Sequence, residues 1–296
     1  MIEKLLDLIK TPIPELIKAR AALTDRYRTH KDKRMKTLAE KESYLLTRFP
    51  ATFAVAEQVF SKIPFAYDSL LDVGSGPGTA SSAALEQNEL KMITCLEQDK
   101  TLLDWAKALI PQADCKLVDF TNTSFTPHDV VVFSYSIGEV NDFLPIIEKG
   151  YEAANKALII IEPGTPHAYQ NLMAMRSFLI QKGAYIIAPC PHLKPCPLLG
   201  HDWCHFSARV QRTRLHKLLK GADLGYEDEK YSYLIVSKTP FKGDARIIRH
   251  VEKHSGHLKM TLCTDVGIQE KTFTRSMESY SKIKKLEWGD SLPLEP

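Results

Sequence analysis

The chain has 296 residues, of which 44% are hydrophobic and 25% are charged, and its formal net charge is +3. This composition is typical of a globular protein and excludes a chain that is disordered throughout, and the length allows one large core with a smaller appendage. No apolar run approaches the roughly 20 residues of a membrane-spanning helix, and the acids Glu3 and Asp7 are unlike a targeting peptide. We therefore expect a cytoplasmic protein that does not enter a membrane.

Residues 1–66 are predicted to form a helical N-terminal region. Apolar residues recur there at helix-like intervals, and Pro12, Pro14 and Pro50 are expected to break the helices. The segment Arg26–Lys36 is rich in arginine and lysine and contains a single acid. A basic cluster attracts phosphate backbones, so this segment is a candidate RNA contact, and a solvated helix face is the alternative.

A glycine loop after the first predicted strand is the most informative motif. The short apolar run 69–73 contains an acid near its end and precedes three glycines at alternate positions, which gives the set Asp72, Gly74, Gly76 and Gly78. Such a strand turns sharply into a helix and leaves its backbone bare for a ligand. In the dinucleotide fingerprint G-x-G-x-x-G the third glycine comes one residue later. The pattern here is closer to the first motif of S-adenosylmethionine-dependent methyltransferases, and a turn without a ligand is the alternative.

Acids also stand at the ends of the next two predicted strands. Glu97 follows the apolar run 92–96, where a carboxylate can accept hydrogen bonds from both ribose hydroxyls of a nucleoside. Asp119 ends the run 115–119, where methyltransferases often contact the adenine amino group. Together with Asp72 and the three glycines, these residues are the predicted S-adenosylmethionine site. The alternative for each acid is an ordinary solvated loop residue.

Strands and helices alternate through residues 67–187. This alternation predicts a doubly wound, mostly parallel sheet, which is an α/β Rossmann-like core of the class I methyltransferase fold with ligands at the carboxyl ends of its strands. The further elements expected in it are strands at 129–134 and 157–161 and helices at 79–88, 101–109 and 142–154.

The residues after the fourth predicted strand do not identify a catalytic group. The run 134–137 (SYSI) lacks the Asn-or-Asp-Pro-Pro-aromatic turn of enzymes that methylate amino groups of bases, and it lacks the cysteine that attacks cytosine. Tyr135, Glu139 and Glu162 are candidates for a target pocket, although core or loop roles are favoured for all three. The catalytic residues are therefore unknown.

Residues 188–222 are predicted to be a cysteine-rich metal-binding insertion followed by a basic helix. Cys190, Cys196 and Cys204 lie within fifteen residues, and a chain without a secretory signal favours a metal over disulfides. Close thiolates repel one another unless a cation neutralises them. A fourth ligand is needed, and the candidates are Cys263, His192, His201 and His205.

The spacing of these cysteines favours an iron–sulfur cluster over zinc. Zinc sites are typically built on close C-x2-C pairs, whereas the gaps here are five and seven residues. A four-cysteine cluster is larger and tolerates wide, uneven gaps. Zinc, or no metal, is the alternative. Cys95 and Cys115 fall in predicted strands and are expected to be core residues.

Residues 223–296 are predicted to complete the core and to add a small β-rich C-terminal region. The basic helix is expected just before them, at 206–219, and the segment Arg209–Lys220, which contains no acid, is a second candidate RNA contact. A last core strand is expected at 231–237. Short tail strands are expected at 245–251, 257–263 and 267–274.

The chain resembles the methyltransferase-like family associated with the small ribosomal subunit. The runs that carry the resemblance are 44–52, 72–78, 161–166, 202–206, 226–233, 249–250 and 255–257, together with Cys190 and Cys196. The resemblance implies a four-cysteine iron–sulfur site at Cys190, Cys196, Cys204 and Cys263, and a role in small-subunit assembly or translation through ribosomal RNA. The lack of a transit peptide matches a bacterial rather than a mitochondrial member.

Two functions of different class follow from these observations. The first is an S-adenosylmethionine-binding methyltransferase with a [4Fe-4S] cluster, acting on the small ribosomal subunit or its ribosomal RNA. The second is a catalytically inactive, RNA-binding assembly factor that keeps the methyltransferase fold and uses its metal site to brace the insertion against the tail. Both hypotheses name the small subunit and its RNA as partners.

Overall fold

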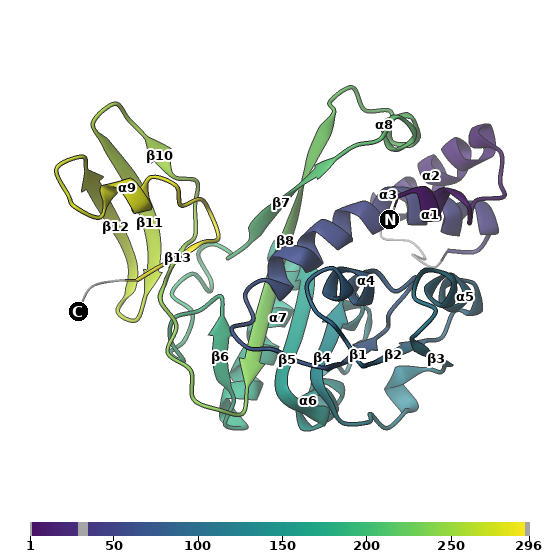
Figure 1. Cartoon of the computed structure of the whole chain (residues 1–296), viewed down its shortest axis with the longest axis horizontal. Helices are drawn as coiled ribbons and strands as arrows, with labels where there is room; N and C mark the ends of the chain where they lie inside the picture. Colours follow the sequence, from purple (N-terminus) through teal and green to yellow (C-terminus); the bar gives the residue numbers. More distant parts are fainter. Residues whose placement is uncertain (1, 29–34, 294–296) are drawn as a thin grey trace.

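The computed structural model describes residues 2–28 and 35–293, and an eight-stranded sheet forms its core (Figure 1). The strands of this sheet are β1 (Ser69–Val73), β2 (Met92–Glu97), β3 (Asp114–Leu117), β4 (His128–Ser134), β5 (Ala154–Pro163), β6 (Tyr185–Ala188), β7 (Phe206–Gln211) and β8 (Tyr226–Ser237). Within the described residues, none of the helices is both long and apolar enough to span a bilayer.

The strand order confirms the predicted doubly wound, Rossmann-like methyltransferase fold. The order is β3-β2-β1-β4-β5-β8-β6, with β7 paired to β8. The first five strands are parallel, and β8 runs antiparallel between β5 and β6. The order reverses between β1 and β4, and the carboxyl ends of the strands at such a reversal are where sheets of this kind bind ligands.

Helices cover both faces of the sheet, so its strands are apolar on both sides. One face packs against α6 and α7, and the other against α3, α4 and α5, as Figure 1 shows. The helices of this part are α3 (Leu38–Phe60), α4 (Thr79–Leu85), α5 (Lys100–Leu109), α6 (Leu144–Ala153) and α7 (Pro166–Gln181), with short 3-10 turns η1 (Phe120–Asn122) and η2 (Ile137–Glu139). The sequence reading predicted α4, α5 and α6 but did not predict α7.

The N-terminal region is helical, as predicted, but Pro50 does not end a helix. The chain forms α1 (Ile2–Leu6) and α2 (Ile13–Arg28), and α3 then continues through Pro50. Most of α3 is buried on both sides of this proline, so tertiary packing outweighs the lost backbone donor. In the basic segment Arg26–Lys36, Arg26 pairs with Glu40 at 2.8 Å, and residues 29–34 lie outside the described part of the chain.

The predicted basic helix at 206–219 is wrong for its first half. Residues 206–211 form β7, in which Phe206, Ala208 and Val210 are buried while the residues between them are more exposed. That period of two belongs to a strand. Only α8 (Arg214–Lys220) is helical, and it joins β7 to β8 at the tip of an arm that lies beside α2 and α3 (Figure 1). Basic residues recur every two or three positions from Arg209 to Lys220, and this spacing does not distinguish a helix from a strand.

The C-terminal region is a second, smaller sheet. It has the order β10-β11-β9-β13, with β12 paired to β11. Its elements are β9 (Ala245–Ile247), β10 (Glu252–Lys253), β11 (His257–Thr264), β12 (Gly267–Thr274), α9 (Tyr280–Ile283) and β13 (Ser291–Leu292). The two long predicted strands are confirmed, whereas the predicted strand 245–251 ends at Ile247. Its small core contains Ile247, Leu258, Met260, Leu262, Ile283 and Leu292.

The close approach of β5 and β8 generates a stability prediction. A Cβ added at Gly164, directly after β5, would lie 2.7 Å from the backbone nitrogen of Tyr231 and 2.8 Å from the carbonyl carbon of Lys230. These atoms belong to a paired strand and cannot yield without breaking its register. We expect Gly164→Ala to lower the free energy of unfolding by about 2 kcal/mol, measured by urea denaturation. Gly225→Ala is the control, because no atom lies within 4 Å of its added Cβ. Equal losses in both variants would contradict this account.

Candidate functional site

The glycine loop lies between β1 and α4, at the reversal of the strand order. Two of its glycines are packing positions: a Cβ at Gly74 would lie 2.5 Å from the Cβ of Ser136, and one at Gly78 would lie 2.8 Å from Cδ1 of Ile110. Gly76 differs, because its φ is +54° and no atom lies within 4 Å of an added Cβ. The backbone at Gly76 is therefore bare and faces open space, as a loop that receives a ligand requires.

Asp72 anchors the helix that follows the loop. Its side chain is only 1% exposed, and Oδ2 accepts hydrogen bonds from the Ser81 backbone N–H and hydroxyl at 3.1 and 2.7 Å. Oδ1 is buried without a partner. Burial raises the pKa of Asp72 to about 6, against the opposing effect of the Ser81 bonds.

Glu97 ties the glycine loop to β2. Its Oε2 accepts from the Gly76 backbone N–H, and its Oε1 accepts from the backbone N–H groups of Gln98 and Asp99, all at 2.8 Å. Burial raises the pKa of this carboxyl. A carboxylate offers about four acceptor positions, so Glu97 holds the loop and keeps room for a ribose hydroxyl.

Asp119 is bonded within its own turn. It follows β3 and caps η1, and its exposed carboxylate accepts hydrogen bonds from Thr121 and Asn122 at 2.7 to 3.0 Å. Within the described residues, no hydrogen bond joins it to the glycine loop. The structure thus joins Glu97 to the loop and leaves Asp119 bonded to its own turn.

The residues after β4 form a buried corner. Tyr135 has a φ of +57°, and the Arg48 guanidinium lies 5.8 Å from its ring centroid. The Tyr135 hydroxyl is buried without a hydrogen-bond partner, and burial holds its pKa well above the usual value. Glu162 Oε1 accepts from the Gly138 backbone N–H at 3.1 Å, and the Glu139 side chain lies outside the described part of the structure.

A second site is formed by four cysteines that line one cavity, which we call the thiol cavity. Its cysteines are Cys190, Cys196, Cys204 and Cys263. The first three come from the segment between β6 and β7, and Cys263 comes from β11 in the C-terminal sheet. The space in this cavity that accepts the centre of a water molecule is about 20 Å³. Cys95 and Cys115 lie elsewhere, paired in register on β2 and β3.

The four cysteines are free thiols in the absence of a ligand. Burial raises the pKa of Cys190 and of Cys204, and it raises the pKa of Cys263 to about 12. A metal would have to displace these protons to form thiolates. Among the residues that the structure describes, no three histidine, cysteine or carboxylate side chains are arranged around a single-ion site.

The three histidines predicted as alternative fourth ligands do not line this cavity. His192 Nε2 is 3.8 Å from the Cys263 sulfur. His205 is stacked on Trp203 with ring centroids 5.0 Å apart, and it meets Trp288 edge-on at 5.1 Å. Of the four predicted alternatives, the thiol cavity is lined by Cys263 alone.

The sequence reading missed a tyrosine in contact with these thiols. Tyr169, on α7, donates a hydrogen bond from its hydroxyl to the Cys196 sulfur at 3.1 Å. No sequence pattern marks Tyr169. Its helix α7 connects β5 to β6, and only the fold brings it beside the cysteines that follow β6.

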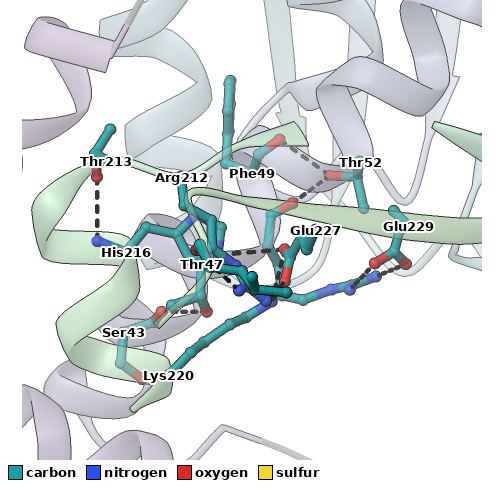
Figure 2. A network of polar contacts seen from close by, with 12 residues as sticks. Ser43, Thr47, Phe49, Thr52, Arg212, Thr213, His216, Lys220, Glu227 and Glu229 are labelled. Carbon is teal, nitrogen blue, oxygen red and sulfur yellow. Dashed lines mark hydrogen bonds and ion pairs between the residues drawn. The ribbon is translucent and has the colours of Figure 1, made fainter. Parts of the chain in front are cut away.

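The second basic segment, Arg209–Lys220, carries much of its charge in ion pairs (Figure 2). Arg212 and Lys220 bond to Glu227 of β8 at 2.8 and 2.6 Å, and His216 Nε2 lies 3.3 Å from the same carboxylate. Although burial opposes the change, the nearby His216 ring and the hydrogen bonds from Lys220 and Arg212 hold the pKa of Glu227 well below its usual range.

Neighbouring acids of β8 pair with further arginines. Arg209 bonds to Asp228 at 2.8 Å, and Arg48 of α3 makes two bonds of 2.9 Å to Glu229 (Figure 2 shows the Glu229 end). The first pair joins β7 to β8 within the arm, and the second fixes the arm to α3. They also leave less positive charge for a phosphate backbone than the sequence of the segment implies.

Comparison with known proteins shows which family the sequence matches. The family model described as "Mitochondrial small ribosomal subunit Rsm22" matches residues 39–293. The human protein "Ribosome assembly protein METTL17, mitochondrial" is 24% identical over 287 residues, which cover 85% of this chain and 62% of that protein. The Schizosaccharomyces pombe "Rsm22-cox11 tandem protein 2, mitochondrial" is 26% identical over 190 residues, 47% of this chain and 24% of that protein. The chain thus spans less than two thirds of the length of these relatives.

Solved methyltransferases share the sheet at low identity. The plantazolicin methyltransferase BpumL, in complex with SAH, is 15% identical at a TM-score of 0.49 and covers 77% of this chain and 98% of its own. A putative RNA methyltransferase from Pyrococcus horikoshii is 14% identical at a TM-score of 0.44 and covers 63% and 84%. The fold assignment rests on the strand order.

Asp72 generates a prediction about pH. Its pKa is about 6 in the folded state against an ordinary 3.8, so the folded state binds more protons between these values. The carboxyl therefore makes the free energy of unfolding fall as pH rises through that window. Asn at this position can accept the same Ser81 bonds without a charge. We expect the free energy of unfolding of Asp72→Asn, relative to that of the wild type, to rise by up to about 3 kcal/mol between pH ~4 and ~7. Urea titrations at several pH values measure this difference. A difference that is constant with pH would contradict this.

Proposed function

The chain belongs to the Rsm22 family, and we propose that it is an S-adenosylmethionine-binding, methyltransferase-like factor that carries a four-cysteine iron–sulfur cluster and acts on the small ribosomal subunit or its RNA. The observation that carries the proposal is the convergence of Cys190, Cys196, Cys204 and Cys263 on one cavity beside a methyltransferase-type sheet. The chain spans only part of the length of its relatives, so its activity and its partners belong to this proposal.

The glycine loop supports the S-adenosylmethionine site. Gly76 offers an open backbone, Asp72 holds an unpartnered acceptor at the base of the loop, and Glu97 fixes the loop beside β2. These are the features that a nucleoside and an amino-acid ammonium group need from a strand end. The bound compound would supply an electrophilic methyl group, and this chain would position it. The role of Asp119 in adenine binding stays a prediction.

The donor chemistry of the thiol cavity supports a cluster more than zinc. Four thiols from two segments face one cavity. Among the described residues, they do not form a site for a single ion. A cubane cluster is wider than one ion, so its four cysteines stand further apart. Bound there, the cluster would join the segment between β6 and β7 to the C-terminal sheet. The free energy of binding the cluster would then stabilise the folded chain.

The ribosomal partner is inferred from the family, whose description names the small ribosomal subunit. The human relative is named as a ribosome assembly protein. On this chain, Arg214 and Lys217 of α8 and the basic segment 26–36 are the candidate RNA contacts, although residues 29–34 are outside the described structure.

A second candidate, an assembly factor without methyl transfer, is favoured by the corner after β4. Tyr135 is held with a pKa well above its usual value by burial, and the Ser136 hydroxyl donates to the Val73 carbonyl at 2.7 Å. Neither group is poised to remove a proton from a methyl acceptor. The protein would then bind the cofactor for structure alone.

Gly76 provides the test of cofactor binding. We expect Gly76→Ala to weaken S-adenosylmethionine binding by at least about tenfold, because the methyl group fills the space that the ligand must enter. Gly221→Ala is a matched control, since Gly221 has a φ of +57° and no atom within 4 Å of an added Cβ. Both variants carry the same backbone strain, and only the first should lose affinity in calorimetry. Wild-type protein that gives no heat with the compound would refute the site.

The same variants separate the two candidate functions. Labelled S-adenosylmethionine and small ribosomal subunits from a strain lacking the protein are incubated with each variant. Methyl transfer by the wild type that is lost in Gly76→Ala identifies the enzyme. Cofactor and particle binding without transfer identifies the assembly factor, and failure to bind the particle refutes both.

The cluster has its own test. We expect protein reconstituted without oxygen, with iron and sulfide, to turn brown and to hold about four irons per chain. Cys196→Ser should lose most of this iron and the visible absorption, because it removes one of the four thiolates. Cys115→Ser, which removes a thiol outside the cavity, should keep both. A colourless protein that retains stoichiometric zinc would contradict the proposal.

A further inference from the structure

We propose that four buried side chains around the thiol cavity hold the anionic charge of the cluster and raise its reduction potential, and that the Tyr233 hydroxyl donates a hydrogen bond to one of its sulfurs. The four supporting residues are Tyr169, Arg176, Tyr233 and Arg246. This inference rests on the iron–sulfur cluster that the proposed function includes. It gives a role to residues other than the four cysteines.

Tyr233 supplies the most direct observation. It lies on β8, is 3% exposed and lines the thiol cavity. Its hydroxyl is buried and has no hydrogen-bond partner. A buried hydroxyl without a partner costs about 1–3 kcal/mol, so such a group in a folded core marks a place where an acceptor belongs. Thiolate and sulfide sulfurs of a cluster are acceptors of this kind.

Two buried arginines supply the charge argument. Arg176 is 2% exposed and Arg246 is 6% exposed. Arg176 donates to the carbonyls of His192 and Lys194 at 2.8 and 2.9 Å. Arg246 donates to the carbonyls of Pro189 and Gly289 at 3.1 and 2.9 Å. Both arginines therefore bond to the backbone of the segment between β6 and β7, which carries Cys190, Cys196 and Cys204.

Neither arginine has a counter-ion in the described residues. No salt bridge there joins Arg176 or Arg246 to a carboxylate, and the Nε of Arg176 is buried without any partner. Buried charges are costly unless they are paired. Arg246 lines the thiol cavity, and the two carbonyls that Arg176 holds lie between Cys190 and Cys196. The missing negative charge is thus expected in the thiol cavity.

A cluster held by four thiolates supplies that charge. The thiolates outweigh the positive charge of the iron–sulfur core, so the whole group is anionic and becomes more so on reduction. Positive charges and hydrogen bonds to sulfur stabilise the reduced form most, which raises the reduction potential. Tyr169 already donates to the Cys196 sulfur at 3.1 Å, and Tyr233 would add a second donor.

Tyr233→Phe tests the inference, because it removes one hydroxyl and keeps the ring. We expect this variant to take up iron and sulfide as the wild type does, and to show a lower midpoint potential in a spectroelectrochemical titration. Tyr231→Phe is the matched control. It removes a hydroxyl from the same strand, but that hydroxyl donates to Gln58 at 2.8 Å and does not face the thiols.

Arg176→Met tests the charge separately. We expect it to lose the cluster to a chelator about tenfold faster than the wild type, with circular dichroism reporting whether the fold is kept. Equal potentials for Tyr233→Phe, Tyr231→Phe and the wild type would overturn the inference while leaving the cluster in place. A wild type that binds no iron and sulfide would refute the cluster, and these four roles with it.

Discussion

Buried positive charge has to be balanced, and the junction of the two sheets depends on how this is done. Arg176 and Arg246 are buried beside four thiols, and within the described residues neither is paired with a carboxylate. The two sheets are otherwise joined by polar and aromatic contacts: Lys194 donates to the Asp265 carbonyl at 2.9 Å, and His205 meets Trp288. A junction of this kind is held by what fills its cavity more than by apolar burial, so ligand and domain position are coupled.

The fold could be predicted from sequence patterns because its strands are short and buried on both faces. The glycine loop and β1 follow from local chemistry, since only glycine serves where Gly76 must present open backbone at positive φ. The arm formed by β7, α8 and β8 was misread for the opposite reason. Its basic residues recur every two or three positions, which does not exclude a helix, but Phe206, Ala208 and Val210 show the true period of two once the partner strand is known.

The thiol cavity was only partly predictable. Three cysteines close in sequence indicate a metal, but the choice of Cys263 over nearby histidines came from a family resemblance, because β11 reaches the cavity through tertiary structure alone. Arg176 carries no sequence signal, and Tyr233 lies in a run that carries the family resemblance but shows no role there. An arginine becomes informative only when its burial and its lack of a counter-ion are visible, and both are properties of the packed chain.

A single strand connects the parts of the molecule that carry function. β8 presents Tyr233 to the thiol cavity, while its Glu229 bonds to Arg48, whose guanidinium lies over Tyr135 at the end of β4. Its far end carries Glu227, which holds α8. Residues 231–236 of β8 pair with β5 and residues 226–231 pair with β7, so hydrogen bonds hold the strand along almost its whole length. Whatever orders the thiol cavity therefore also fixes the corner beside the glycine loop and the basic tip of the arm, because all three are attached to the same strand.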